Sequence, residues 1–468
     1  MKASKLYTPL VFLALLAVPI AMLIGEKQSI SMDEKRKLAE WPSFSWEDWT
    51  SGAYGAAIDD YFDDHLPVRE VVMHWADGVK YAWGVHPVVA ERKVVVKPAK
   101  REPLDTSKAG SDSARMNYLN DFDESYSGEM LIIDGAVYTQ NSGNPAMSPS
   151  FAKMLNEYAE KLKGHTRVFS CVAPLSSAFI PVEKYGHLRQ RNKSTLEAIR
   201  DNLQGPIFCD VMGEMLLKQN QKLFFGTDHH WTARGAYCGY VSFCKAAGFA
   251  PVKLEQMTRK VKTGFLGSLY SLTRDATVRE HADTFEYFKP RIEASAVRFS
   301  ESSLDRPMKS AVFCESFRGS ACYMTFICGD APLIKITTGV KNGRKAAVVK
   351  NSMGNAFSVY LISHYEEIWV FDYRYSKHVM LDIIYDREID DLIFALGMYG
   401  AMSNGTIHMM RKLGEGGVGM RPRRTESDSI QSDSLIPAPS QIPAAPNDSV
   451  IPLVPDVIDK IENDSNGE

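Results

Sequence analysis

The sequence is poor in the features that mark nucleic-acid and nucleotide binding. The formal net charge of its 468 residues is -3, and no block of Lys and Arg stands out along the chain. A general nucleic-acid binder needs a cationic face that collects phosphates. The G-x-x-x-x-G-K-[ST] loop is also missing, and no G-x-G-x-x-G follows a segment of strand character. We therefore expect neither a nucleic-acid partner nor a cofactor.

Cysteine and histidine are scarce as well. None of the 7 cysteines forms a C-x-x-C pair, and the odd number leaves at least one thiol free even if export allows others to pair. Most of them lie in apolar runs, where a buried free thiol is expected. The 11 histidines include no second cluster with Cys or Asp at metal-ligand spacing. Apart from the histidine pair at 229 and 230, the sequence therefore offers no candidate metal ligands.

The N-terminus carries a long apolar run. Lys2 and Lys5 precede an uncharged stretch from Leu6 to Gly25, close to the ~20 residues with which a helix crosses a bilayer. Positive charge before the run predicts a cytoplasmic N-terminus and export of the rest. A cleaved signal peptide is the alternative, but no small-x-small cleavage site precedes Glu26. We expect residues 1–26 to be a single-pass membrane anchor and the rest of the chain to lie on the other side of the membrane from the N-terminus.

The remainder divides by composition into one large domain and smaller parts. Residues 27–110 have apolar and aromatic side chains at helical spacing, with a break at Pro67, and predict a membrane-proximal helical region. Residues 111–415 form the expected large domain. Residues 420–468 are rich in Pro, Ser and Asp and predict a disordered tail.

From about residue 130, short apolar runs alternate with amphipathic helices. Buried strands are expected at RVFSCVAP, AAVVK and EIWVFDYRY. This alternation predicts an α/β domain with a mainly parallel central sheet flanked by helices. Residues 255–340 are less regular, with strand-like pieces such as ADTFEYF and ACYMTFICG. They are expected to be an insertion or an extension of the sheet.

The segment TDHHWTARGAY places Asp228, His229, His230 and Trp231 side by side. Three interpretations compete: a metal site, a structural helix start with Asp228 as N-cap, and the base of a nucleophile. Adjacent histidines point in opposite directions on a strand and diverge by ~100° on a helix, so both rarely reach one ion. Spacing of i to i+2 places Asp228 and His230 on one side of an extended segment. A carboxylate there orients an imidazole that deprotonates a serine.

The candidate serine is Ser352, in KAAVVKNSMGNAF. It follows a buried strand and precedes a helix, which places it at the carboxyl edge of a parallel sheet, where ligands gather. The unpaired N–H groups of the helix are suited to hold an oxyanion. Gly354 permits close approach of a substrate, and Asn355 offers an amide donor. The alternative is that Ser352 is a plain N-cap, which the local sequence alone favours.

TDHHWTARGAY, and VVKNSMGNAF with HYEEIWVFDYRY, resemble the DHHW family. This family is related to the periplasmic alginate O-acetyltransferases, whose domain is a permuted SGNH-hydrolase-like fold in which the Asp and His precede the serine. Further similar stretches are YFDDHLPVRE, GFLGSLYS, ADTFEYF and CGDAPLIKI, so that the resemblance spans about 30 to about 410.

The resemblance implies that Asp228, His230 and Ser352 form a catalytic triad, with His229 and Trp231 as motif members that pack or line the site. It implies an SGNH-like O-acetyltransferase that moves an acetyl group to an exopolysaccharide through an acetyl-serine. It also implies a membrane-bound O-acyltransferase partner that supplies the acetyl group.

Two residues qualify this picture. The family usually has Asp immediately before the serine, whereas this chain has Asn351. Arg374, just after the expected strand end at Asp372, is a candidate for substrate contact or for a structural ion pair. The alternatives are an acetyl esterase with the same triad, a non-catalytic carbohydrate-binding or assembly protein on a degenerate fold, which Asn351 keeps open, and a metal hydrolase.

Overall fold

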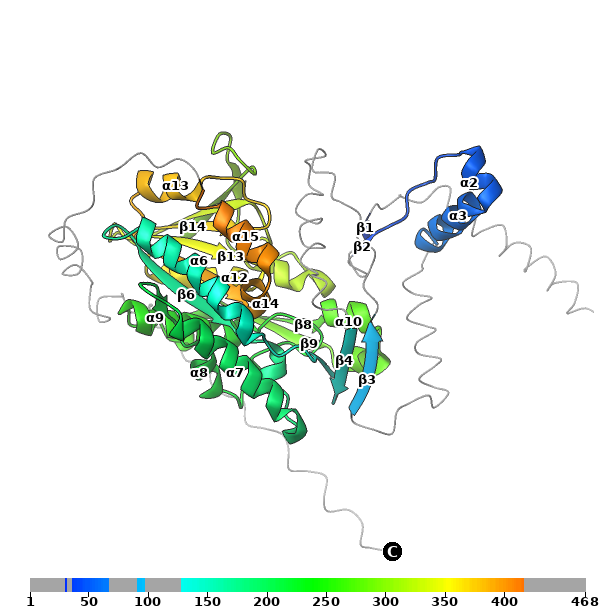
Figure 1. Cartoon of the computed structure of the whole chain (residues 1–468), viewed down its shortest axis with the longest axis horizontal. Helices are drawn as coiled ribbons and strands as arrows, with labels where there is room; N and C mark the ends of the chain where they lie inside the picture. The colour runs from blue at the N-terminus through cyan, green and yellow to red at the C-terminus, as the bar shows by residue number, and fades with distance from the viewer. Residues whose placement is uncertain (1–29, 32–35, 67–90, 97–127, 416–468) are drawn as a thin grey trace, which may run out of the picture.

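The computed structural model describes residues 30–31, 36–66, 91–96 and 128–415 (Figure 1). The expected anchor at 1–26, the break at Pro67 and the expected tail at 420–468 lie outside these residues. Among the helices that the structure describes, none combines the length and the apolar character that a membrane span requires.

The centre of the molecule is an eight-stranded sheet of order β11-β10-β12-β14-β13-β15-β6-β7. The strands from β14 to β7 pair in parallel, and the strands at the other edge, β11, β10 and β12, pair antiparallel. The parallel strands are β6 (Arg167–Ala173), β7 (Ile207–Phe208), β13 (Lys345–Lys350), β14 (Glu367–Asp372) and β15 (Asp391–Gly397). The antiparallel strands are β10 (Ala294–Phe299), β11 (Met308–Ser310) and β12 (Leu333–Thr338). The predicted α/β fold with a mainly parallel sheet is confirmed.

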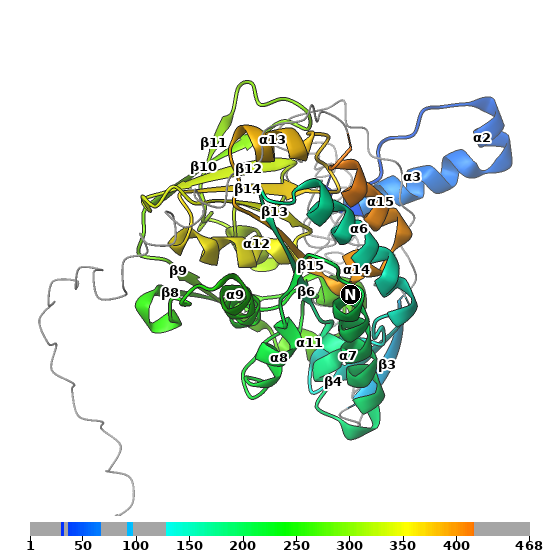
Figure 2. The same ribbon diagram turned by 60° about the vertical axis from the view of Figure 1, so that its left-hand side comes forward.

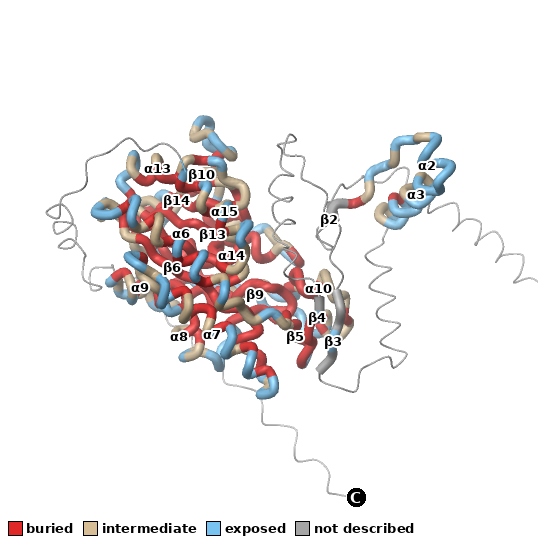
Figure 3. Tube along the Cα trace, viewed as in Figure 1, coloured by how far each residue is buried: buried red, intermediate tan, exposed pale blue. Residues whose placement is uncertain are grey.

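Helices cover both faces of this sheet (Figure 2). Successive side chains of a strand point to opposite faces, so each central strand feeds two cores. Val348 and Ile393 pack in the core that α9 and α12 complete, and Val349 and Phe394 in the core of α6 and α15. Figure 3 shows the strands between them as a continuous buried region. The helices are α6 (Ser148–Lys161), α7 (Gly186–Asp201), α8 (Val211–Leu216), α9 (Ala233–Ala247), α12 (Met353–Ser358), α13 (Met380–Asp386), α14 (Met398–Met402) and α15 (Asn404–Lys412).

A small three-stranded sheet precedes this domain. Strands β4 (Gly128–Ile133) and β5 (Ala136–Thr139) form a hairpin whose turn residues, Asp134 and Gly135, both have positive φ, as a type I′ turn requires. Strand β3 (Glu91–Val96) pairs with β4. It lies inside the range 27–110, for which the sequence predicts helices, and is a correction to that prediction. Helices α2 (Trp46–Ser51) and α3 (Ala53–Asp64), with the short β1 (Ile30–Ser31) and β2 (Arg36–Lys37), are the other described elements there.

Residues 255–340 form two separate pieces of β-structure. Strands β8 (Thr258–Phe265) and β9 (Asp283–Lys289) form a separate antiparallel pair, with α10 (Ser268–Thr273) and α11 (Ala276–Glu280) between them, while β10 to β12 extend the central sheet. The stretch ACYMTFICG, expected to be strand-like, is instead mostly a 3-10 helix, η6 (Gly319–Thr325). A short apolar run indicates burial but does not distinguish a strand from a helical turn.

Two cysteines form a disulfide, Cys314–Cys328. The other five are free and buried, as expected for apolar runs: Cys171, Cys209, Cys238, Cys244 and Cys322.

A buried histidine predicts acid sensitivity of the fold. His364 follows η7 (Val359–Ser363), and its Nε2 lies 2.6 Å from the hydroxyl of Tyr240, which accepts the Val252 N–H. Burial, reinforced by the charge of Arg344, lowers the pKa of His364 to about 4. The unfolded chain takes up this proton near pH 6.5, so its uptake destabilises the fold below that pH.

We therefore expect the free energy of unfolding to fall as the pH drops from 6.5 to 4, with up to about 3 kcal/mol of the loss due to His364. Above pH 6.5, His364 should not change the free energy of unfolding. Urea denaturation at pH 7 and pH 4.5 measures this. His364→Gln should be less stable at pH 7 but lose less on acidification. An equal loss in both proteins would contradict the assignment.

Candidate active site

Ser352 lies at the carboxyl edge of the parallel sheet. Strand β13 ends at Lys350 and α12 begins at Met353, and β13 is flanked by β14 and β15. Within the described structure, the Ser352 hydroxyl caps no N–H group of α12. It lies instead 2.8 Å from Nε2 of His230. The plain N-cap interpretation is therefore not supported, although Ser352 occupies the N-cap position.

The structure brings Asp228, His230 and Ser352 into one line. Oδ1 of Asp228 lies 2.5 Å from Nδ1 of His230, on the opposite side of the imidazole from Ser352. Asp228 and His230 are fully buried, and Ser352 is 4% exposed. A carboxylate at Nδ1 keeps the proton there and leaves Nε2 as an acceptor for the serine proton. The arrangement can activate Ser352 as a nucleophile for acyl transfer.

The helix start at Ser268 holds the Asp228 carboxylate. Oδ2 of Asp228 accepts the N–H of Ser268 at 2.8 Å, and Oδ1 also accepts the N–H of His230 at 3.0 Å. A Cβ on Gly267 would lie 2.2 Å from Cβ of Asp228, so only glycine allows this approach. GFLGSLYS contains both residues, and the sequence pattern predicts a role for neither.

A second carboxylate holds the loop that carries the motif. Asp283, at the start of β9, accepts the N–H groups of Gly226 at 3.1 Å and Thr227 at 2.7 Å. It also accepts the Thr227 hydroxyl at 2.7 Å. The extended shape of the segment before His230 therefore depends on a residue from a distant strand.

Two aromatic rings lie against His230. The ring of Tyr323 stacks on the imidazole with 3.6 Å between centroids and 11° between planes, and the His229 ring lies at 3.7 Å. Nδ1 of His229 lies 2.7 Å from the Ser268 hydroxyl. Trp231 is fully buried, and its Nε1–H donates to the Met353 carbonyl at 3.0 Å. Trp231 supports the serine turn, and Tyr323 is a site residue that the sequence reasoning missed.

The structure gives Gly354 and Asn355 other partners than the substrate. A Cβ on Gly354 would lie 2.4 Å from Cβ of Lys350 and 2.8 Å from the Ala395 carbonyl oxygen, so this glycine lets α12 pack on β13 and β15. The Asn355 side-chain amide donates to Asp330 at 2.9 Å. Both residues therefore shape the turn that carries Ser352.

The backbone N–H groups after Ser352 have acceptors within this turn. The Gly354 N–H donates to the Asn351 carbonyl at 2.9 Å and the Asn355 N–H to the Ser352 carbonyl at 3.0 Å. The Met353 N–H makes the longest bond, 3.3 Å, to Oδ1 of Asn351. Oδ1 of Asn351 also accepts the Gly397 N–H at 3.2 Å. An Asp side chain would offer the same acceptor oxygen, so Asn351 keeps the hydrogen bonds from the Met353 and Gly397 N–H groups.

Arg374 belongs to a buried ion network. It forms two hydrogen bonds with Asp372, at 2.8 Å and 2.7 Å, and lies 2.9 Å from Asp330. Lys350 lies 2.5 Å from Asp330 and 2.7 Å from Asp372. Two carboxylates therefore face two cations in a buried network that includes Lys350, two residues before Ser352. Of the two alternatives for Arg374, the structure supports the ion pair.

The donor atoms of Asp228, His229 and His230 lie within 4.8 Å of one another, close enough to hold an ion. However, both nitrogens of His230 face other groups, Asp228 and Ser352, and Nδ1 of His229 faces Ser268. An ion would have to displace these hydrogen bonds. The bonding therefore favours proton transfer over metal ligation.

A small pocket borders the triad. It lies between the β5 edge of the small sheet and the loops at the carboxyl edge of the large one, and two of its residues, His229 and Met353, directly adjoin His230 and Ser352. Its lining combines apolar side chains with hydroxyl groups: Thr139, Leu175, Ser176, His229, Leu269, Met353 and Tyr399. Ser352 and His230 are not among the lining residues, so the pocket adjoins the triad and does not contain it.

The close contact at Gly267 yields a prediction about activity. Gly267→Ala should push Asp228 away from His230 and lower the rate of p-nitrophenyl acetate cleavage by about 100-fold, because misplacement by about 1 Å has this cost. Gly186→Ala is the control, since a Cβ there meets nothing within 4 Å. Equal rates in the two variants, each with a wild-type melting profile, would contradict this role for Gly267.

The ion network yields a prediction about stability. Lys350→Met leaves two buried carboxylates with one cation and should lower the free energy of unfolding by about 3–5 kcal/mol. Lys345→Met, at the other and partly exposed end of β13, should cost about 0.5 kcal/mol or less. Urea denaturation measures both. A Lys350→Met protein as stable as Lys345→Met would show that the network is not the support we describe.

Comparisons with known proteins place the chain in a family. The family model described as DHHW protein matches residues 94–371. The fold is similar to that of a DHHW family protein from Eubacterium siraeum, with 28% identity, a TM-score of 0.55, and coverage of 60% of this chain and 94% of that one. No curated protein matches the chain.

Weaker likenesses involve two further solved structures. Bacillus cereus PatB1, solved with a sulfonyl adduct, has 16% identity and a TM-score of 0.49, over 61% of this chain and 100% of that one. The O-acetyltransferase domain of Pseudomonas putida AlgJ has 10% identity and a TM-score of 0.32, over 59% and 96%. Neither supports more than a general similarity. The match to the family model extends over more than half of the chain and includes His230 and Ser352, and the protein therefore belongs to the DHHW family.

Proposed function

We propose that this protein is a cell-envelope O-acetyltransferase that moves an acetyl group to a hydroxyl of an exopolysaccharide through an acetyl-serine at Ser352. The observation that carries the proposal is the hydrogen-bonded line from Asp228 through His230 to Ser352, with 2.5 Å and 2.8 Å between the facing atoms. The resemblance of the DHHW family to SGNH-like alginate O-acetyltransferases supports the choice of acetyl transfer.

In the first half-reaction, Nε2 of His230 takes the hydroxyl proton of Ser352 as Oγ attacks the acetyl carbonyl of the donor. The carbonyl reforms, the donor's leaving group departs with the proton from His230, and Ser352 carries the acetyl group. Asp228 retains Nδ1–H in the correct tautomer and stabilises the imidazolium. Burial of Asp228 and His230 strengthens this interaction because water does not screen it.

In the second half-reaction, a sugar hydroxyl gives its proton to His230 and attacks the acetyl carbon. Ser352 leaves with the proton that His230 returns, and the sugar ester is released. The oxyanion of each step needs a donor beside Ser352. We assign the Met353 N–H to it, because its bond to Asn351 is the longest in the turn and the easiest to exchange.

The small pocket beside the triad has a lining compatible with part of a polar acceptor. It includes three hydroxyl-bearing residues, Thr139, Ser176 and Tyr399, of which Thr139 and Tyr399 lie 3.3 Å apart at their hydroxyls, together with Leu175 and Leu269. Such a mixture of polar and apolar residues is typical of ligand sites. A membrane-bound O-acyltransferase partner would supply the acetyl group. The anchor expected at 1–26 would hold the domain on the outer side of the inner membrane, next to that partner.

An acetyl-enzyme is the expected result of incubating the purified full-length protein with p-nitrophenyl acetate. Intact-mass spectrometry should show a gain of one acetyl group in the wild type and none in Ser352→Ala. Asp228→Asn should acylate about 10⁴-fold more slowly, because the wrong imidazole tautomer then faces the serine.

Acetylated glycan oligomers then separate transfer from hydrolysis. Appearance of acetyl groups on an added exopolysaccharide fragment supports the transferase, and release of free acetate alone supports the esterase. A folded wild-type protein that gains no acetyl group and releases no p-nitrophenol would overturn both and favour a binding protein.

A further inference from the structure

Tyr323 contacts two members of the triad. Its ring stacks on the imidazole of His230, as described above, and its hydroxyl donates to the backbone carbonyl of Ser352 at 3.2 Å. Tyr323 is itself only 1% exposed. One side chain therefore contacts both the base, His230, and the nucleophile, Ser352, and neither half-reaction described above uses it.

The segment that carries Tyr323 belongs to no sheet. It is the 3-10 helix η6, in the connection between β11 and β12. Its flanks are joined by a single antiparallel bridge between Phe313 and Phe326, in which the Cys314 N–H donates to the Thr325 carbonyl at 3.0 Å and the Ile327 N–H to the Val312 carbonyl at 2.8 Å. Within the described residues no longer ladder continues from this bridge, so the placement of Tyr323 against His230 also depends on side-chain contacts and on the disulfide.

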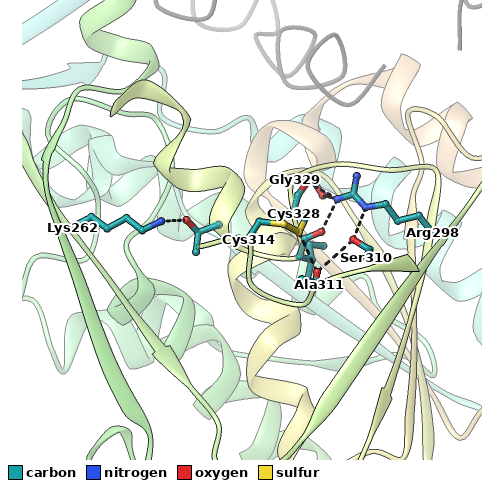
Figure 4. The surroundings of a disulfide bond; sticks show 9 residues. Lys262, Arg298, Ser310, Ala311, Cys314, Cys328 and Gly329 are labelled. Atoms are coloured by element: carbon teal, nitrogen blue, oxygen red, sulfur yellow. Dashed lines mark hydrogen bonds between the residues drawn. A yellow bond between two sulfur atoms is a disulfide. The ribbon is translucent and has the colours of Figure 1, made fainter. Parts of the chain in front are cut away.

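A disulfide closes this segment into a loop (Figure 4). Cys314 and Cys328 are 14 residues apart, with 5.1 Å between their Cα atoms, and Tyr323 lies between them. Cys328 Sγ also lies 3.2 Å from the Ala311 carbonyl. The disulfide thus joins the two ends of the stretch that carries η6.

Two cationic side chains, from Lys262 and Arg298, form hydrogen bonds to the rest of the loop. Lys262, from β8, donates to the Thr325 hydroxyl at 2.7 Å and to the Phe317 carbonyl at 2.9 Å. Arg298, from β10, donates to the carbonyls of Ile327 at 2.8 Å and Gly329 at 3.3 Å, and also to that of Cys328 (Figure 4).

The backbone conformation at the end of the loop depends on these contacts. Ile327 and Cys328 have φ of 45° and 56°, the left-handed region that side chains rarely adopt, above all a β-branched one. Such conformations persist only where surrounding contacts hold them. The disulfide and Arg298 both act at this point.

We propose that Tyr323 is a positioning residue for His230, and that the Cys314–Cys328 disulfide holds Tyr323 in place, so that acylation of Ser352 depends on the oxidation state of this cysteine pair. The proposal rests on the proposed function. Reduction by a dithiol breaks the S–S bond: the dithiol gives up two electrons and two protons and becomes a disulfide, and Cys314 and Cys328 become thiols.

The physical role of Tyr323 is to support the charged form of the base. His230 becomes an imidazolium as it takes the serine proton, and the face of an aromatic ring attracts a cation. The stack also fixes the plane of the imidazole, on which the line from Asp228 to Ser352 depends. Phe at this position keeps both effects and loses only the hydroxyl contact, whereas Leu loses both.

Single-turnover acylation of the full-length protein by p-nitrophenyl acetate tests the proposal. Tyr323→Leu should acylate about 10- to 100-fold more slowly at saturating ester, with KM within about twofold, whereas Tyr323→Phe should stay within about threefold of wild type. Dithiothreitol should slow the wild type about 10-fold and reoxidation should restore it. The double variant Cys314→Ser/Cys328→Ser should be slow and indifferent to dithiothreitol.

Cys322→Ser is the matched control. Cys322 is free, buried and adjacent to Tyr323, and burial raises the pKa of its thiol, which therefore stays protonated. This variant should keep the wild-type response to dithiothreitol. Loss of that response would show that Cys322, not the disulfide, is the redox-sensitive group and would overturn the proposal.

A spectroscopic readout separates this proposal from the proposed function. The Nδ1–H proton of His230, hydrogen-bonded to Asp228, is observed by NMR in histidine-labelled protein without any turnover. Its resonance should shift in Tyr323→Leu and on reduction, but not in Tyr323→Phe. A shift without acylation in the wild type would sustain the positioning role and reject acyl transfer. Acylation with unchanged rates and resonance in Tyr323→Leu and reduced protein would reject the positioning role.

Discussion

The contact between the Asp228 carboxylate and Nδ1 of His230 is the constraint on which the site depends. It is short, 2.5 Å, and buried, and it decides which nitrogen of His230 faces Ser352. A buried carboxylate is stable only when its oxygens have donors. The N–H groups of Ser268 and His230 supply them, and the glycine at 267 makes room for the approach. The geometry of the base is thus built from two segments that are about 40 residues apart in the chain.

The nucleophile has a separate support. Ser352 stands on a short turn between β13 and α12, and glycine at 354 lets that helix lie close to the sheet. Below the turn, Lys350 and Arg374 neutralise Asp330 and Asp372. Buried ion pairs of this kind contribute little net stability but are costly to break. The network links β13, β14 and the segment just before β12, so that the serine turn is connected to its neighbours in the sheet.

The two supports meet in the segment from 314 to 330. This segment supplies Tyr323 to the base and Asp330 to the ion network, and the disulfide joins Cys314 to Cys328 within it. In the sequence part of it looks like an extra strand, yet its apolar side chains are buried in the core beside β9, where Phe326 packs on Phe285, and Tyr323 reaches from there to His230. Its position explains why the insertion between β9 and β13 belongs to the catalytic machinery that we propose.

The sequence by itself determined the fold class, and its resemblance to the DHHW family singled out Asp228, His230 and Ser352. Alternation of buried strands with amphipathic helices sets the parallel sheet, and spacing of i to i+2 sets the common side of an acid and a histidine, because both are local consequences of backbone geometry. Only the tertiary structure decided the rest. Gly267, Ser268 and Tyr323 act across long sequence separations. Asn355, a candidate amide donor, and Arg374, a candidate for substrate contact or for an ion pair, both bind Asp330. Which donor a buried carboxylate finds depends on segments brought together by packing, and a single sequence without its fold does not contain those distances.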